Sequence, residues 1–242
     1  MTDWNSVFDG ILTERQFKVN EPMNRHNTYG IGGPADVFVM PQTEDQLKQV
    51  LRRADELHIP VTVIGGGSNS LISDRGIRGI TLCTARMKSS TVRNGNQIIV
   101  TGGAGTGAVS RFAMKEGLSG LEFAAGIPGT LLGAVFMNAN GYGSKFANVV
   151  HSVRTVTRDG RQEKHYTLEE IQYGDSDSVF MHNGDIVLEV VFDLKEGNPE
   201  EIKAVMDEYQ ASRRAKQPLE KRSAGTMFLR PPGHYVGPMI KG

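Results

Sequence analysis

The sequence is poor in the features that mark secreted, membrane-bound and nucleic-acid-binding proteins. Cys83 is the one cysteine among 242 residues, which excludes an intramolecular disulfide and a metal cluster with cysteine ligands. The 27 lysines and arginines match the 27 aspartates and glutamates, so no net charge attracts nucleic acid or an anionic membrane. No apolar run is long enough to span a bilayer, and residues 1–15 lack the apolar core of a signal peptide. The sequence therefore predicts a soluble, cytoplasmic protein with no nucleic-acid, membrane or metal partner.

Glycine, in contrast, is plentiful, and it gathers in two segments. They are Ile64-Gly65-Gly66-Gly67-Ser68-Asn69-Ser70 and Gly126-Ile127-Pro128-Gly129-Thr130-Leu131-Leu132-Gly133-Ala134. Closely spaced glycines let the backbone approach a ligand, and successive N–H groups form an anion cradle suited to a diphosphate. Each charge-assisted bond of this kind contributes about 1.5–3 kcal/mol. Two such cradles in one chain predict a large ligand held from both sides, with a nucleotide cofactor as the first interpretation.

Two other interpretations of the glycine segments stay open on pattern alone. Gly65 and Gly67 match the first two glycines of the dinucleotide fingerprint, but Ser70 stands at the third position. Residues 71–77 have the pattern of a strand and a turn, whereas a Rossmann loop requires a helix there. The other interpretation is that both segments are tight structural turns. The hydroxyl and amide groups of Ser68 and Asn69 argue against it, because they add donors for a phosphate.

Hydrophobic periodicity predicts a small α/β unit in the first third of the chain. An amphipathic helix over Thr43–His58 begins with a Thr43–Gln46 capping box. Strands are predicted around it at Ala35–Met40, Pro60–Ile64 and Gly76–Leu82. The buried face of the helix is predicted to be Leu47, Val50, Leu51, Ala54 and Leu57.

From about Ser89 a second unit of mixed composition follows. The predicted strands are Gln97–Thr101, Val149–Thr157, Arg161–Tyr166 and Ile186–Leu194, with a hairpin turn at Arg158-Asp159-Gly160. The predicted helices are Thr106–Lys115, a short capped helix after Thr167, and Pro199–Arg214, whose buried face is Ile202, Val205, Met206 and Tyr209. The basic cluster Arg213-Arg214-Ala215-Lys216 is interpreted as a solvated helix end. Residues 217–242 show no obvious structural unit.

Several stretches give the chain a specific resemblance to a known family. Besides Gly65–Asn69 they are Asn27-Thr28-Tyr29-Gly30-Ile31-Gly32-Gly33-Pro34-Ala35-Asp36, Gly120-Leu121-Glu122-Phe123-Ala124-Ala125-Gly126-Ile127-Pro128-Gly129, Gly133-Ala134-Val135-Phe136-Met137-Asn138, Tyr142-Gly143, Ala215-Lys216-Gln217-Pro218-Leu219 and Ser223-Ala224-Gly225. In this order they resemble bacterial UDP-N-acetylenolpyruvoylglucosamine reductase, also called UDP-N-acetylmuramate dehydrogenase. The family makes UDP-N-acetylmuramate for the peptidoglycan of the cell wall. The resemblance covers residues 20–239.

The resemblance implies an α+β fold with two FAD-binding subdomains of the vanillyl-alcohol-oxidase type. The expected boundaries are an N-terminal extension at 1–19, FAD-binding subdomains at 20–84 and 85–196, and an incomplete α/β substrate-binding domain at 197–242. FAD would lie between the subdomains. Its implied contacts are Ile64, Gly65, Gly66, Gly67, Ser68 and Asn69 at the diphosphate, and Gly126, Ile127, Pro128, Gly129, Thr130 and Gly133 near the isoalloxazine. The substrate contacts would be Tyr142 and Tyr173.

The resemblance also implies the reaction. NADPH reduces FAD, NADP leaves, and the enolpyruvyl sugar nucleotide takes its place. Hydride passes from the flavin to the terminal carbon of the substrate, and a serine protonates the neighbouring carbon. An arginine and a glutamate stabilise the enolate. The expected partner is thus a UDP-linked amino sugar, and no metal takes part.

The chain departs from the family at these three catalytic positions. In Tyr173-Gly174-Asp175-Ser176, Gly174 replaces the arginine that follows the tyrosine, and no nearby residue offers its bidentate guanidinium. Asp175 and Asp177 would bring charge of the wrong sign near an enolate, unless Tyr173–Asp177 is a solvated polar loop. Thr226 replaces the proton-donating serine and keeps a hydroxyl, while Leu229 and Pro238 replace usual basic residues. The family glutamate belongs to a segment beyond Gly242, so it is expected to be absent.

These departures leave three hypotheses. The first is an FAD-dependent, NADPH-using reductase that converts UDP-N-acetylglucosamine enolpyruvate to UDP-N-acetylmuramate with impaired catalysis. The second is a catalytically inactive FAD-binding paralogue. The third is a partly folded remnant without a function. Intact glycine segments favour non-covalent FAD binding in either of the first two.

Overall fold

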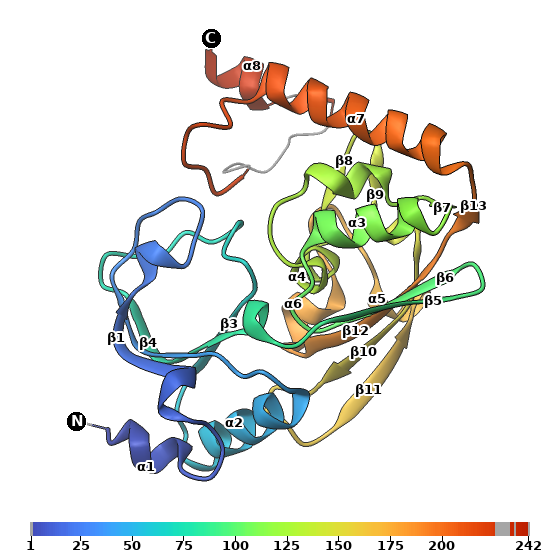
Figure 1. Cartoon of the computed structure of the whole chain (residues 1–242). Coiled ribbons are helices and arrows are strands. Elements are labelled where there is room, and N and C mark those ends of the chain that lie inside the picture. Colours follow the sequence, from blue (N-terminus) through green and yellow to red (C-terminus); the bar gives the residue numbers. More distant parts are fainter. Residues whose placement is uncertain (1, 226–232, 235, 242) are drawn as a thin grey trace.

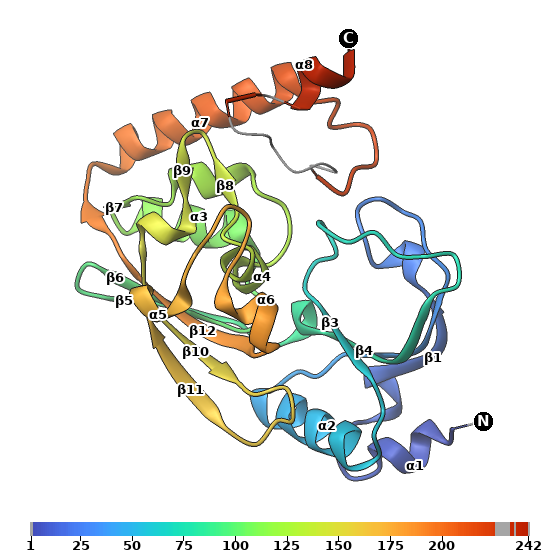
Figure 2. The same ribbon diagram turned by 180° about the vertical axis from the view of Figure 1, so that it is seen from behind.

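Two β-sheets form the framework of the protein, shown from opposite sides in Figures 1 and 2. The computed structural model describes residues 2–225, 233–234 and 236–241. The first sheet has the order β1-β2-β4-β3, with β1 (Phe17–Pro22), β2 (Pro34–Val39), β3 (Val61–Ile64) and β4 (Ile77–Cys83). β4 is parallel to both β2 and β3, whereas β1 is antiparallel to β2. The predicted α/β unit is confirmed, with β1 as an additional edge strand.

Helix α2 (Glu44–Glu56) connects β2 to β3 and forms where periodicity predicted it. Its buried residues are Leu47, Val50, Leu51 and Ala54. The Thr43 hydroxyl caps the helix by accepting the Gln46 N–H at 3.2 Å. The predicted capping box is one-sided, because the Gln46 side chain accepts the Gln42 N–H instead. Leu57 is 50% exposed, since the helix ends one residue earlier, so its prediction as a core residue was wrong.

The second sheet is antiparallel and has the order β11-β10-β12-β6-β5. Its strands are β5 (Ser90–Asn94), β6 (Gln97–Thr101), β10 (Val150–Val156), β11 (Glu163–Thr167) and β12 (Ile186–Asp193). The predicted strands are confirmed, and β5 is an unpredicted partner of β6. Helices α3 (Thr106–Lys115) and α4 (Leu131–Phe136) share a core with this sheet through Val109, Leu131 and Val135.

Helix α2 also brings the two sheets together. The core around it contains Val37 and Ile80 from the first sheet. The same core contains Val156, Ile186 and Leu188 from the second. Figure 1 shows α2 beside the ends of β10 and β12. We call the part built on the first sheet the first lobe and the part built on the second sheet the second lobe. One continuous apolar cluster therefore fixes the two lobes against each other.

The N-terminal residues are part of the first lobe. Asp3 caps α1 (Trp4–Phe8) by accepting the N–H groups of Asn5 and Ser6 at 3.1 and 3.4 Å. Trp4 and Phe8 are buried and stack on each other, with ring centroids 5.9 Å apart. The sequence pattern did not predict this helix, because five residues make less than two turns and are too few to show a helical period.

Short elements join these layers. The 3₁₀ turns are η1 (Glu14–Gln16), η2 (Met23–Arg25), η3 (Thr84–Arg86), η4 (Glu122–Gly126) and η5 (Phe146–Asn148). The short strand pairs are β7 (Leu118–Ser119) with β13 (Lys195–Glu196) and β8 (Asn140–Gly141) with β9 (Ser144–Lys145). The remaining short helices are α5 (Leu168–Ile171), with the capping box predicted at Thr167, and α6 (Val179–Asn183).

Helix α7 (Pro199–Lys216) crosses over α3 and η4 (Figure 1). Ile202 and Met206 are buried as predicted, but Val205 is 37% exposed, so its assignment to the buried face was wrong. The stretch predicted to lack structure contains helix α8 (Val236–Lys241), which corrects that expectation. Within the part of the chain that the structure describes, no helix is both long and apolar enough to cross a membrane. The domain boundaries assigned from sequence stay a prediction.

Candidate active site

The two glycine segments contact each other directly. The Ser68 hydroxyl donates to the Pro128 carbonyl at 3.0 Å. A Cβ added to Gly66 would lie 2.8 Å from the Gly129 Cα, and one added to Gly65 would lie 2.4 Å from the Thr130 Oγ1. Only glycine fits at these two positions. The prediction that both segments contribute to one site is therefore supported by their contact.

Each segment is held by the end of a regular element. The first follows β3, and its Gly67, with φ +66°, packs so closely that a Cβ there would lie 2.1 Å from the His26 carbonyl oxygen. The second runs from the last residue of η4 into the first turn of α4. The Gly129 carbonyl accepts the Thr106 N–H at 3.1 Å, and the Leu131 N–H donates to the Ala104 carbonyl at 2.8 Å. These bonds anchor the second segment to the start of α3.

The facing surfaces present donors that have no protein partner. Among the described residues, nothing accepts the backbone N–H groups of Gly66, Gly67, Ser68, Gly129 and Thr130. The Thr130 hydroxyl is buried and also makes no hydrogen bond there. A buried polar group without a partner costs about 1–3 kcal/mol. The site residues thus fit a bound anionic group that accepts these bonds.

A cavity of about 370 Å³ opens beside the first segment. Its lining is Arg25, His26, Asn27, Thr28, Gly65, Gly66, Cys83, Ala85 and Arg86. Arg25 ends η2 and Arg86 ends η3, so two guanidinium groups border the same cavity as Gly65 and Gly66. Guanidinium groups are well suited to phosphate oxygens. Neither arginine was predicted from sequence, because the two lie some sixty residues apart and belong to no motif.

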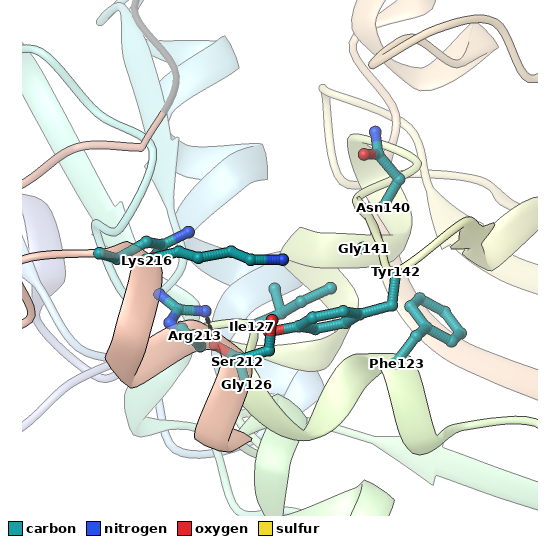
Figure 3. A pocket seen from close by; sticks show the side chains of 10 residues that line it. Phe123, Gly126, Ile127, Asn140, Gly141, Tyr142, Ser212, Arg213 and Lys216 are labelled. Carbon is teal, nitrogen blue, oxygen red and sulfur yellow. Dashed lines mark hydrogen bonds between the residues drawn. The ribbon is translucent and has the colours of Figure 1, made fainter. Parts of the chain in front are cut away.

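A second cavity of about 220 Å³ lies between η4, β8 and the end of α7 (Figure 3). It is lined by Phe123, Gly126, Ile127, Asn140, Gly141, Tyr142, Ser212, Arg213, Lys216 and Gln217. Arg213 donates to the Gly126 carbonyl, which joins α7 to the second glycine segment. The basic cluster is a solvated helix end, as predicted, at Arg214, Ala215 and Lys216, which are exposed, but Arg213 is half-buried and departs from that interpretation.

Tyr142, predicted to bind substrate, borders this second cavity. Its ring stacks on that of Tyr209 in α7, with centroids 4.1 Å apart and planes 4° from parallel. Its hydroxyl donates to the Tyr209 carbonyl at 2.6 Å. The side chain remains 40% exposed, which leaves one part of the ring at the cavity.

The Tyr173–Asp177 segment packs against α4. The Tyr173 hydroxyl donates to the Val135 carbonyl at 3.1 Å, and burial raises the pKa of Tyr173 well above its usual value. The buried Asn138 side chain donates to the Gly174 carbonyl at 2.8 Å. Asp175 is exposed, and Asp177 pairs with His182 at 2.9 Å. Ser176 is exposed beside Asp175, so the loop is solvated at these two residues and held to the protein at Tyr173 and Gly174. Tyr173 lines neither of the two cavities.

A third segment reaches the first glycine loop from beyond α7. The Thr28 hydroxyl donates to the Ser223 carbonyl at 2.6 Å, and a Cβ on Gly225 would lie 3.6 Å from the Asn69 Oδ1. Thr226 and Leu229 lie outside the described residues, while Pro238 is exposed in α8. In the described part of the chain, no cluster of three or more His, Cys, Asp or Glu side chains could hold a metal ion.

Comparisons with known proteins agree with this geometry. Residues 35–165 match a family model described as an FAD binding domain. A UDP-N-acetylenolpyruvoylglucosamine reductase from Geobacillus thermodenitrificans is 45% identical over 231 residues, which are 96% of this chain and 75% of that protein.

Solved structures show the same relationship. The crystal structure of UDP-N-acetylenolpyruvylglucosamine reductase from Thermus caldophilus superimposes with a TM-score of 0.74 and 30% identity. The match covers 93% of this chain and 78% of that one. Phl p 4, a grass pollen allergen with glucose dehydrogenase activity, has a TM-score of 0.59 at 16% identity, covering 81% and 45% of the two chains. That likeness shows the fold alone, the FAD-binding fold of the vanillyl-alcohol-oxidase type.

Proposed function

The chain belongs to the UDP-N-acetylenolpyruvoylglucosamine reductase family, and we propose that it holds FAD between its two glycine segments and uses NADPH to reduce an enolpyruvyl UDP-amino sugar. The observation that carries this proposal is the unpaired, buried Thr130 hydroxyl beside the free N–H groups of Gly66 and Gly129. Bound FAD supplies a ring that accepts and returns hydride. The protein groups bind and orient it through bonds to its diphosphate.

The diphosphate position is supported by charge as well as by donors. Arg25 and Arg86 border the cavity that touches Gly65 and Gly66. Both guanidinium groups attract a diphosphate before any N–H bond forms, and the glycine loop then fixes its orientation. Ile64, Ser68 and Asn69 complete the first proposed contact surface, and Ile127, Pro128 and Gly133 belong to the second.

The UDP-amino sugar is assigned to the cavity between η4 and α7. Arg213 and Lys216 provide cations for a diphosphate, and Tyr142 and Phe123 provide aromatic surface (Figure 3). Gly126 and Ile127 line this cavity and also belong to the second glycine segment, so substrate and cofactor would meet there. We propose Tyr142 as a direct contact. Tyr173 is proposed to support the substrate site indirectly, because its hydroxyl holds α4 through the bond to the Val135 carbonyl.

Two catalytic assignments extend the proposal. Thr226 is assigned as the proton donor, since its hydroxyl stands where the family has a serine. Gly174 stands where the family has an arginine, and a Cβ there would lie 3.2 Å from the Asp177 Cβ. Because this neighbour is a carboxylate and not a cation, it offers no stabilisation to an enolate. That observation favours a second candidate function, an FAD-binding paralogue with little turnover.

Separate half-reactions distinguish the two candidates. The purified protein is reconstituted with FAD and mixed anaerobically with NADPH, and flavin bleaching is followed by absorbance. The enolpyruvyl UDP-sugar is then added and reoxidation is recorded. Bleaching followed by rapid reoxidation supports a reductase, whereas bleaching without reoxidation supports the paralogue. A well-folded protein that binds no FAD would contradict both candidates. A cytoplasmic location is proposed with this function, because NADPH and nucleotide sugars are supplied there.

A further inference from the structure

A rigid turn lies between η2 and β2, under the first glycine loop. The Asn27 amide donates to the carbonyls of Met23 and Ile31 at 2.7 and 2.8 Å. Its carbonyl oxygen accepts the Gly30 N–H at 2.7 Å. One side chain therefore closes the turn with three bonds. These bonds fix the backbone position of the next residue, Thr28.

Thr28 bonds in two opposite directions. Its backbone N–H donates to the Gly67 carbonyl at 3.2 Å, inside the first glycine loop. Its hydroxyl donates to the Ser223 carbonyl at 2.6 Å, and its own carbonyl accepts the Ser223 N–H at 3.3 Å. The same residue thus contacts the cofactor cradle on one side and the chain beyond α7 on the other.

The segment beyond α7 is shaped to meet this contact. Arg222 donates to the Gly30 carbonyl at 3.2 Å, and the Ser223 hydroxyl accepts the Gly225 N–H at 3.1 Å. Gly225 has a φ of +85° and lies beside Asn69. Figure 2 shows the chain leaving α7 and returning toward the loops of the first sheet. The bonds of Thr28 and Gly30 fasten it there.

We propose that Thr28 is a positioning residue that fastens the Ser223–Gly225 segment to the first glycine loop. This proposal deepens the proposed function and rests on it in one respect: an FAD held by Gly66–Asn69 would stiffen the loop that Thr28 contacts. Filling the cradle therefore orders the segment on the far side of Thr28. Linkage is reciprocal, so fixing the segment also tightens the cradle around its ligand.

Hydrogen exchange of the peptide containing Ser223 tests the proposal. Thr28→Val keeps the shape and both backbone bonds but removes the donor to the Ser223 carbonyl. We expect exchange at Ser223 to be about fivefold faster in this variant, the effect of losing one hydrogen bond. Thr28→Ser retains the hydroxyl and should restore the wild-type rate. Thr91→Val, on β5, is the matched control, because no described residue bonds the Thr91 hydroxyl. Equal exchange in Thr28→Val and wild type would overturn the proposal.

The FAD arm of the experiment tests the coupling separately. FAD should slow exchange at Ser223 in wild type and in Thr28→Ser, but have little effect in Thr28→Val. FAD affinity should also fall in Thr28→Val and return in Thr28→Ser, because the linkage between segment and cradle is reciprocal. If FAD binds and wild-type exchange does not respond, the coupling is wrong. If FAD does not bind at all, the proposed function fails, and exchange in the FAD-free proteins still decides whether Thr28 fastens the segment.

Discussion

Arg154 and Glu44 form a two-pronged ion pair that joins the two lobes. The Nη1–Oε2 and Nη2–Oε1 distances are both 2.9 Å. Arg154 belongs to β10, and Glu44 is the first residue of α2. Glu163 and Glu189 contact the same guanidinium at 3.1 and 3.5 Å. The hydrogen bonds that Arg154 donates to Glu44, followed by attraction to the nearby carboxylates, raise the pKa of Arg154, so it stays charged. This pair helps to hold the glycine segments, one on each lobe, in contact.

Arg154→Met should destabilise the protein by about 1–3 kcal/mol. The Arg154 side chain is only 15% exposed, and its loss removes the cation that three neighbouring carboxylates share, with Lys48 left beside Glu44 and Glu163. The measurement is the free energy of unfolding in urea. Arg161→Met is the control, since the Arg161–Asp55 pair is about half exposed and solvent screening should leave its contribution small. Equal losses in both variants would show that the Arg154 network has no special role.

Acid should weaken the same network. A hydrogen bond from Lys48, followed by one from Arg154, lowers the pKa of Glu163 below its ordinary 4.5. A carboxylate with a lowered folded-state pKa stabilises the protein above that ordinary value, and this stabilisation is lost as pH falls through the lower value. Wild-type stability should therefore drop below about pH 4.5, and Glu163→Gln should drop less steeply. The effect is small, because the side chain is 40% exposed. Urea midpoints between pH 6 and 3 check this, and identical slopes in the two proteins would contradict it.

Two buried threonines give a paired test of the cofactor site. Thr130 and Thr81 both have buried hydroxyls without a hydrogen-bond partner among the described residues. Thr130→Val and Thr81→Val should each leave the FAD-free protein as stable as wild type or more stable, because an unpaired polar atom is removed. Only Thr130→Val should weaken FAD binding, by about tenfold. Thermal unfolding and FAD titration measure the two effects. If both variants bound FAD like wild type, Thr130 would have no role in the cradle.

A second pair tests the close approach of the glycine segments. Gly66→Ala places a methyl group 2.8 Å from the Gly129 Cα, so one segment has to move and FAD affinity should fall at least tenfold. Gly105→Ala makes the same chemical change 3.9 Å from its nearest neighbour, the Gly129 carbonyl oxygen, and should be tolerated. FAD dissociation constants of the two variants decide the matter. Similar values would reduce the Gly66 segment to a structural turn.

Substitutions at two neighbouring cations of α7 test the cavity beside this helix. Lys216 lines the cavity, whereas Arg214 is exposed on the same helix and does not line it. Lys216→Ala should weaken the binding of UDP-N-acetylglucosamine about tenfold, because a charge-assisted bond to phosphate is lost. Arg214→Ala should bind like wild type. Calorimetric titration compares them without requiring turnover. Unchanged binding in Lys216→Ala would contradict the assignment of the substrate to this cavity.

Local pattern predicted the elements that carry their own signals. The 3.6-residue period and Thr43 placed α2, and the apolar runs placed β6 and β12 within a residue of their observed bounds. Edge strand β5 was missed, since its residues are mostly exposed and β6 alone dictates its pairing. Helix α4 was missed because four of its six residues, Leu131–Ala134, belong to the second glycine segment and include Gly133.

The sequence by itself determined that two glycine segments exist and that the chain belongs to a flavin-binding family, and it predicts that Gly174 and Thr226 stand where the family has an arginine and a serine. Those facts depend on residue identity and local order. Only the tertiary structure decided that Arg25 and Arg86 border one cavity, that Tyr173 is bound to Val135, and that Thr28 contacts both Gly67 and Ser223. Each of these contacts joins residues far apart in the chain. Their distances are set by how two sheets pack around α2, and no local pattern encodes that packing.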